Sequence, residues 1–184
     1  MNGKKPIIER KTDLPDGARE IWFAGGCFWG LEKYFSGIHG VLAVSVGYAN
    51  GKVTFPTYAE VCTGTTGCAE TVHVVYDPLK SPLSRLLGLY MNVIDPTSLN
   101  RQGPDIGTQY RTGIYYIDDA DLPAINAEIK KADAASNDPV VVEVMPLVSY
   151  YLAEEYHQEY LKKNPAGYCH ISDRLFKHSQ DFVD

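Results

Sequence analysis

The feature that most constrains the fold of this chain is the order in which strand-like and helix-like segments follow one another. Buried strands show short apolar runs or period-two alternation, whereas helices repeat apolar residues every three or four positions. Six segments read as strand, helix, strand, strand, helix and strand: 20–26, 28–38, 41–46, 70–76, 82–94 and 112–117. This order predicts an α+β fold of the ferredoxin-like α/β plait type, with a βαββαβ core.

The segments after this core predict one more helix and strand and then a loop-rich tail. We expect a helix at 119–135, a strand at 139–147 and a short helix at 153–163. Within the core, Ser81 is expected to cap the helix that Pro82 begins. The whole of 1–184 is expected to form a single catalytic domain, with its core at about 20–163 and a C-terminal loop segment at 164–184.

The predicted strand order brings distant residues to one edge of the sheet. In the usual plait the first and third strands are neighbours, so Cys27, after the first strand, should lie beside Glu70 at the start of the third. The loops at 47–69 and 95–111 should reach the same edge. Long ordered loops in a compact domain are usually functional. We therefore expect the functional site at this edge.

Composition excludes several classes of function. With 184 residues and 45% hydrophobic content, the chain can bury a core of its own. Its net charge of −6 and lack of a Lys/Arg cluster argue against nucleic acid or an anionic membrane as partner. No signal-like or membrane-spanning apolar stretch is found. We expect a cytoplasmic, monomeric protein.

The four cysteines are expected to be reduced thiols and not a disulfide framework or a metal site. Cys27 follows two glycines at a strand-to-helix junction, where unpaired N–H groups and the helix dipole favour a thiolate. It is our candidate nucleophile, with a space-filling core cysteine as the alternative. Cys169, in the Pro/Gly-containing tail, is the best resolving-thiol candidate. Cys62 and Cys68 are left as spectators, alternate partners or packing residues.

Polar and aromatic residues around this edge suggest a substrate pocket. Phe28 and Trp29 are either core residues or the floor of a pocket for a methyl or thioether group. Glu70 is either an exposed strand end or a general acid whose apolar surroundings retain its proton. Tyr58, Asp105 and Tyr110, in the two long loops, are either packing and turn residues or ligands of a polar oxygen.

The histidines do not suggest a hydrolase. A Cys-His pair needs an imidazole within hydrogen-bond reach of the thiol, and no histidine falls in the two long loops or next to Glu70 in the sequence. The stretch "EYHQEY", which contains His157, is expected to be a solvated helix face.

Four stretches of this sequence closely resemble the A-type peptide methionine sulfoxide reductases over roughly residues 20 to 170. They are "GCFWG", "PTYAEVCTGTTG" with the "AE" that follows Cys68, "NRQGPDIGTQYR" and "KNPAGYC". Family members commonly have His where Cys68 stands. The resemblance also implies an α/β plait, consistent with the strand order.

The resemblance implies a role for each candidate residue. Cys27 matches the catalytic cysteine and Glu70 the glutamate that protonates the sulfoxide oxygen. Phe28 and Trp29 match the aromatic pocket for the substrate's ε-methyl group. Tyr58 and Tyr110 match the tyrosines that bind the oxygen, Asp105 matches an aspartate of the substrate site, and Cys169 matches the recycling cysteine.

The implied reaction is the reduction of the S epimer of methionine sulfoxide in proteins, with the free amino acid as an open alternative. Cys27 would become a sulfenic acid, and Cys169 would condense with it to a Cys27–Cys169 disulfide, because no cysteine follows Cys169. The resemblance implies no bound cofactor and no metal. Thioredoxin, or dithiothreitol in vitro, would be the external reductant, and oxidised proteins would be the substrates.

Two other functions share some of these features. A thiol peroxidase also forms a sulfenic acid, but an Arg or Thr is expected beside its cysteine instead of two aromatic residues. A binding module for Met-rich segments would need Trp29 but not Cys27. Peroxide consumption without sulfoxide reduction would indicate the first, and activity that survives loss of the Cys27 thiol would indicate the second.

Overall fold

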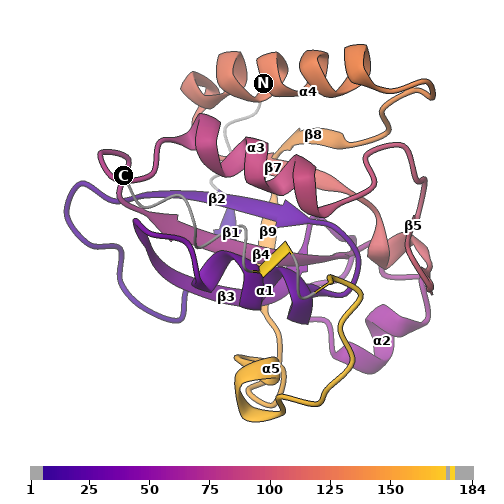
Figure 1. Ribbon diagram of the computed structural model, residues 1–184. Coiled ribbons are helices and arrows are strands. Elements are labelled where there is room, and N and C mark those ends of the chain that lie inside the picture. The colour runs from indigo at the N-terminus through magenta and orange to yellow at the C-terminus, as the bar shows by residue number, and fades with distance from the viewer. Residues whose placement is uncertain (1–5, 173–174, 177–184) are drawn as a thin grey trace.

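The computed structural model describes residues 6–172 and 175–176, which form a mixed α+β fold (Figure 1). A seven-stranded sheet runs in the order β1-β9-β3-β4-β2-β7-β8. Its strands are Ile7–Ile8 (β1), Arg19–Ala24 (β2), Val41–Ala49 (β3), Ala69–Tyr76 (β4), Gly113–Tyr116 (β7), Glu143–Pro146 (β8) and Ser149–Leu152 (β9). The helices are Phe28–Ser36 (α1), Tyr58–Cys62 (α2), Leu83–Val93 (α3), Leu122–Ala135 (α4) and Tyr160–Lys163 (α5).

The expected contact between the first and third strands of the core is confirmed, because β2 and β4 are neighbours. β4 pairs antiparallel with both β2 and β3, and β7 pairs antiparallel with β2. The outer pairs β1–β9 and β7–β8 are parallel, so the sheet as a whole is mixed. Ala24, at the end of β2, lies opposite Thr71, near the start of β4. The register therefore brings the turn after β2 next to Glu70.

Helices α1 and α3 cover one face of this sheet, and α4 packs on α3 (Figure 1). Phe23 of β2 lies at the centre of the contact, with its ring 4.9 Å from that of Phe35 on α1 and 4.7 Å from that of Tyr90 on α3. On the opposite face Trp22 stacks on His73 at 4.5 Å. Because β2 is held on both faces, the residue that begins α1 has a fixed position relative to the sheet.

The predicted helices and strands before residue 153 are confirmed with changes at their ends. The predicted helix at 119–135 begins with a 3₁₀ turn, Asp119–Asp121 (η2), before α4. Pro82, and not Ser81, is the N-cap of α3, and the Ser81 side chain is buried without a capping hydrogen bond. The predicted strand 139–147 is reduced to β8, because its ladder with β7 starts only where Glu143 meets Gly113.

The helix predicted at 153–163 is wrong over most of its length. Only α5 is helical there, and residues 155–159 form turns. Glu159 adopts a left-handed backbone with φ 51°, which interrupts a helix. The Gln158 side chain binds the backbone N–H and C=O of Val46 on β3. These tertiary contacts replace the solvated helix that the spacing indicated.

Several short elements were not predicted. They are β1, β9, α2, the hairpin of Arg101–Gln102 (β5) with Asp105–Ile106 (β6), and the 3₁₀ turn Thr108–Tyr110 (η1). Part of the expected C-terminal loop segment, at 173–174 and 177–184, lies outside the described residues. Within the part that is described, every helix is too short or too polar to cross a membrane.

Candidate active site

Cys27 lies in a tight turn between β2 and α1, as the sequence predicts. Gly26 has φ 79°, and a Cβ atom there would lie 2.7 Å from the Cβ of Gln102. Its backbone N–H donates to the C=O of Tyr110 at 3.2 Å. This position therefore requires glycine. The close approach of 102 and 110 confirms that the loop at 95–111 reaches the turn.

The Cys27 thiol is buried at the N-cap of α1, 8% exposed. Burial raises the pKa of this thiol above its usual range, and the nearby Glu70 carboxyl raises it further. The backbone hydrogen bond from Trp29 lowers the pKa, but by less. The sequence suggested a thiolate favoured by the start of the helix; in the structure, loss of solvent outweighs that effect.

Glu70 lies inside the protein and not at an exposed strand end. It is 1% exposed, and its Oε2 accepts a hydrogen bond from the Phe28 backbone N–H at 3.1 Å. Burial raises the pKa of the Glu70 carboxyl to about 8; the Phe28 hydrogen bond opposes this and the Asp105 charge adds to it. At neutral pH this carboxyl carries a proton that it can transfer.

Phe28 and Trp29 point in different directions from α1. Phe28 is 1% exposed and its ring lies 6.0 Å from that of Tyr48, so it is largely a core residue. Trp29 is half-buried and stacks on Tyr160 of α5 at 3.7 Å. Its indole Nε1–H donates to Nδ1 of His157 at 3.1 Å. Trp29 is therefore the aromatic residue that remains accessible beside the Cys27 turn.

His157 is a site residue that the sequence analysis missed. It was assigned to a solvated helix face, but it is 1% exposed, and its ring lies 5.3 Å from Phe28, 5.7 Å from Trp29 and 4.4 Å from Tyr58. Burial lowers the pKa of this imidazole, which keeps it neutral as the acceptor for Trp29. The spacing of apolar residues in 153–163 gave no signal of this arrangement.

Tyr58 and Tyr110 approach from the two long loops. Tyr58 begins α2, where Thr57 forms a capping box with Glu60, and its backbone N–H donates to Oε1 of Glu154 at 2.8 Å. Burial raises the pKa of both tyrosine hydroxyls above the usual range, and the Glu70 carboxyl adds to both shifts. Both phenols therefore remain protonated as hydrogen-bond donors.

The C-terminal segment, which carries Cys169, packs against α1 at this edge of the sheet. In Figure 1 its yellow trace crosses in front of α1. A Cβ atom built on Gly30 would lie 3.2 Å from Sγ of Cys169, so this sulfur lies against α1, near the helix end that begins at Cys27. Asp105 accepts a hydrogen bond from the Tyr168 hydroxyl at 3.1 Å. Nδ1 of His170 is 3.8 Å from the Asp105 carboxylate, so His170 is a second histidine at this edge that the sequence did not indicate.

The structure thus gathers all eight candidate residues around the start of α1. Cys27, Phe28 and Trp29 come from its first turn, Glu70 from β4, Tyr58 from α2, Asp105 from β6, Tyr110 from η1, and Cys169 from the tail. Among residues 6–172 and 175–176, no three His, Cys, Asp or Glu side chains form a group able to hold a metal ion.

Comparison with known proteins identifies relatives of this chain. The family model described as "Peptide methionine sulfoxide reductase" matches residues 19–182. The peptide methionine sulfoxide reductase MsrA of Lachnoclostridium phytofermentans is 57% identical over 158 residues, covering 86% of this chain and 95% of that protein.

Solved structures agree with this assignment. The reduced form of Mxr1 from Saccharomyces cerevisiae is 36% identical with a TM-score of 0.82, covering 90% of this chain and 96% of that chain. The same yeast protein in complex with Trx2 matches with a TM-score of 0.61 at 24% identity over 84% of this chain and 92% of that chain, which supports the fold alone. The chain therefore belongs to the peptide methionine sulfoxide reductase family.

Proposed function

We propose that this enzyme reduces methionine sulfoxide in oxidised proteins to methionine, with Cys27 as the nucleophile. The observation that carries the proposal is the buried Glu70 carboxyl, with a pKa of about 8, bonded to the backbone at the Cys27 turn. A sulfoxide oxygen needs a proton before a thiol can take it. Family membership supports the same reaction, and the family resemblance adds a preference for the S epimer.

The proposed oxygen transfer uses one thiol and one carboxyl. Glu70 protonates the sulfoxide oxygen, which makes the sulfur electrophilic. The Cys27 sulfur bonds to the substrate's sulfur, and the hydroxyl group then moves to the Cys27 sulfur. The transient sulfur–sulfur bond and the substrate's sulfur–oxygen bond both break, which leaves Cys27 as a sulfenic acid. The proton lost by the Cys27 thiol restores the one that Glu70 gave. Methionine leaves, reduced by two electrons, and Cys27 is oxidised by two.

The neighbouring residues would hold the substrate. The Tyr58 and Tyr110 hydroxyls, whose pKa values are raised by burial, would donate hydrogen bonds to the sulfoxide oxygen. Trp29 would contact the ε-methyl group, and Phe28 would border the pocket from the core side. Asp105 would orient this side of the site through Tyr168. These assignments are supported by the convergence of the five side chains on the Cys27 turn.

Cys169 would complete the cycle. Its thiol would attack the Cys27 sulfenic acid, forming a Cys27–Cys169 disulfide and releasing water. Its position against Gly30 of α1 supports this role. A dithiol such as thioredoxin would then reduce the disulfide by exchange, with no bound cofactor. The yeast relative Mxr1 has been solved in complex with Trx2, which supports this choice of reductant.

We further propose that residues 1–184 act as one catalytic domain built on a ferredoxin-like plait. The order β3-β4-β2-β7 and the two crossover helices α1 and α3 support it.

Replacing Cys169 tests the cycle. Cys169→Ser should release about one methionine per enzyme in a first turnover and then stall with thioredoxin, because the sulfenic acid has no resolving thiol. Methionine release is measured by rapid quench, and free thiols are counted before and after one equivalent of substrate.

Cys68→Ser is the matched control, since it makes the same change at a cysteine that contacts Thr66 and Gly51, and it should keep full turnover. Sustained turnover of Cys169→Ser would remove the resolving role. Oxygen transfer by Cys27→Ser would remove the nucleophile and with it the proposed function.

A further inference from the structure

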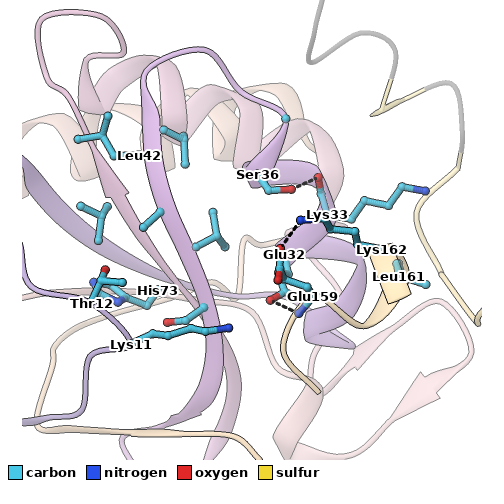
Figure 2. Close-up of a pocket in the computed structure, with 16 residues that line it drawn as sticks. Lys11, Thr12, Glu32, Lys33, Ser36, Leu42, His73, Glu159, Leu161 and Lys162 are labelled. Atoms are coloured by element: carbon cyan, nitrogen blue, oxygen red, sulfur yellow. Dashed lines mark hydrogen bonds and ion pairs between the residues drawn. The ribbon is translucent and has the colours of Figure 1, made fainter. Parts of the chain in front are cut away.

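A cavity separate from the Cys27 turn lies beside the C-terminal half of α1 (Figure 2). Its volume is about 630 Å³. Figure 2 shows Lys33 and Ser36 of α1 on one side of the β3 ribbon and Lys11 and Thr12 of the N-terminal segment toward the other. Residues 41–45 of β3 line the cavity between them. The site described above does not use this space.

The cavity follows an open edge of the sheet. β9 pairs with β3 only at Gly47, Tyr48 and Ala49, and no other described strand pairs with β3 on that side. At Val46 the Gln158 amide takes over, accepting from the backbone N–H and donating to the C=O. Backbone groups alternate in direction along a strand, so those of Val44 point the same way as those of Val46. The edge at Val44 therefore presents a donor and an acceptor to the cavity.

Residues from both faces of the sheet line this one cavity. Val44 packs against the core on the α1 face, whereas His73 stacks on Trp22 on the opposite face. A cavity that touches both must pass around the edge of β3. Leu42, which is 46% exposed, adds an apolar side chain to the same rim. This combination of backbone hydrogen-bonding groups and apolar contact is what an added β-strand requires.

The charges around the cavity favour an acidic occupant. Lys11, Lys33 and Lys162 line it, although the protein as a whole carries a net charge of −6. Glu159 forms an exposed ion pair with Lys162, and Glu32 lies buried, accepting the Glu159 backbone N–H at 2.8 Å. Burial raises the pKa of the Glu32 carboxyl to about 7, which reduces the negative charge at this wall.

Two helices, α1 and α5, contribute residues both to the cavity and to the candidate active site. Tyr160 of α5 stacks on Trp29, while Leu161 and Lys162 of the same helix line the cavity. On β3, Val44 lies four residues before Tyr48, which pairs with Glu70. An extended chain rises about 3.3 Å per residue, so a flank of roughly four residues spans the distance between these two positions.

We propose that the open edge of β3 binds an extended acidic segment of the oxidised protein substrate, which adds to the sheet as a strand beside Val44. This inference rests on the proposed function and names its substrate class: methionine sulfoxide flanked, about four residues away, by a β-forming stretch with Asp or Glu. Such a flank would contribute affinity without touching the reacting atoms.

A pair of double variants tests this cavity, called the groove below, directly. Leu42→Glu with Lys33→Glu places negative charge and removes apolar contact in the groove. Leu79→Glu with Lys131→Glu is the matched control, since Leu79 is 95% exposed, Lys131 is a surface lysine, and neither lines the cavity. The probe is a fluorescent ten-residue peptide of Val, Thr and Asp with unoxidised methionine. Its Kd, from anisotropy, should rise about tenfold in the first variant and stay unchanged in the control.

Two further measurements separate this inference from the proposed function. Adding the peptide should slow hydrogen exchange at the Val44 amide. With the oxidised peptide, kcat/KM should fall about tenfold in the groove variant, whereas N-acetylmethionine sulfoxide should be reduced as by wild type.

An unprotected Val44 amide, equal Kd values in both double variants, or dimerisation of the wild type through this edge without peptide binding would overturn the inference. Failure of wild type to reduce either substrate would overturn the proposed function, while the unoxidised peptide would still report on the groove.

Discussion

At the scale of single residues, the proposed chemistry depends on two acids in one buried site, the Cys27 thiol and the Glu70 carboxyl. Burial raises the pKa of both the Cys27 thiol and the Glu70 carboxyl, and the Glu70 charge raises that of the thiol further, so both groups are protonated in the resting site at neutral pH. The carboxyl, with a pKa of about 8, is the easier proton donor. We expect the Cys27 thiol to lose its proton only when the sulfoxide oxygen gains one. Without substrate Cys27 therefore stays a thiol, which is oxidised more slowly than a thiolate.

Glu70→Gln keeps the shape of the side chain and removes its transferable proton. Single-turnover oxygen transfer should slow by roughly 10²–10⁴-fold, the usual effect of a positioned acid. In wild type the rate should decline as the pH rises through about 8, because Glu70 is then ionised. Rapid-quench rates across pH provide the measurement. A variant as fast as wild type would exclude Glu70 as the acid.

The same pKa predicts a dependence of stability on pH. The folded protein binds the Glu70 proton more tightly than the unfolded chain, so this group's contribution to the free energy of unfolding falls as the pH rises from about 4.5 to about 8. Glu70→Gln should lack this decline and should become the more stable protein near pH 8.5. Urea unfolding at several pH values measures it; parallel curves for the two proteins would contradict it.

His157 is a positioning residue for the Trp29 ring. His157→Phe keeps an aromatic ring against Tyr58 but removes the acceptor for the indole N–H. Loss of one hydrogen bond, about 1 kcal/mol, should raise KM about fivefold with a smaller change in kcat. Steady-state kinetics provide the measurement, with His39→Phe on the exposed turn before β3 as control. An unchanged KM would show that Trp29 is held by Tyr160 alone.

At the scale of elements, α1 links the two halves of the proposed cycle. Its N-cap is Cys27, and one turn later Gly30 lets the C-terminal segment approach, with Cys169 Sγ and Ile171 Cδ1 at 3.2 and 3.0 Å from a built Cβ. The helix thus positions the proposed nucleophile directly, and Gly30, which has no side chain, leaves room for the proposed resolving cysteine.

Gly30→Ala should therefore separate the two steps. The added methyl group displaces the C-terminal segment by a few tenths of an ångström. Because a disulfide needs a defined distance between its two cysteines, disulfide formation should slow about several-fold. The first methionine should still be released at the wild-type rate. Quenched-flow thiol counting follows both steps. Equal slowing of both steps would mean that the change disturbs Cys27 itself.

At the scale of the whole molecule, the N-terminal segment is tied to the sheet by a partly buried ion pair. Arg10 binds both oxygens of Glu20 on β2, and Nε2 of His73 lies 3.0 Å from the same carboxylate. Burial alone would raise the pKa of Glu20, but the hydrogen bonds from Arg10 and His73 outweigh it and lower the pKa to about 2. The segment after β1 is thereby fastened to the centre of the fold.

Arg10→Gln should lower the free energy of unfolding by about 1 kcal/mol at pH 7, a value reduced because the guanidinium is partly exposed. A depressed carboxyl pKa stabilises the protein above about 4.5 and loses its effect as the pH falls toward about 2. The difference in the free energy of unfolding between wild type and variant, the gap below, should therefore disappear over that pH range. Denaturant titrations measure it, with Lys131→Gln in an exposed pair as control. A gap that persists at pH 2 would contradict the assignment.

The sequence by itself was enough for the central strands and for the turn that carries Cys27, because apolar periodicity and glycine turns act over a few neighbouring residues. The eight candidate residues followed from the strand order together with the family resemblance, and their roles remain predictions. For Glu70 the sequence left two alternatives, an exposed strand end and a general acid in apolar surroundings, and the strand order favoured the second. These features depend on local spacing and strand order.

Only the tertiary structure decided the rest. The stretch 153–163 has helical spacing, yet Gln158 satisfies the backbone of β3 and His157 accepts from Trp29, and such contacts between distant residues outweigh local propensity. The sequence suggested a lowered pKa for the Cys27 thiol, whereas in the structure this pKa is raised. The reason is again tertiary, because desolvation depends on all the residues packed around Cys27. The open edge of β3 likewise exists only because β9 stops pairing at Gly47, which no local pattern records.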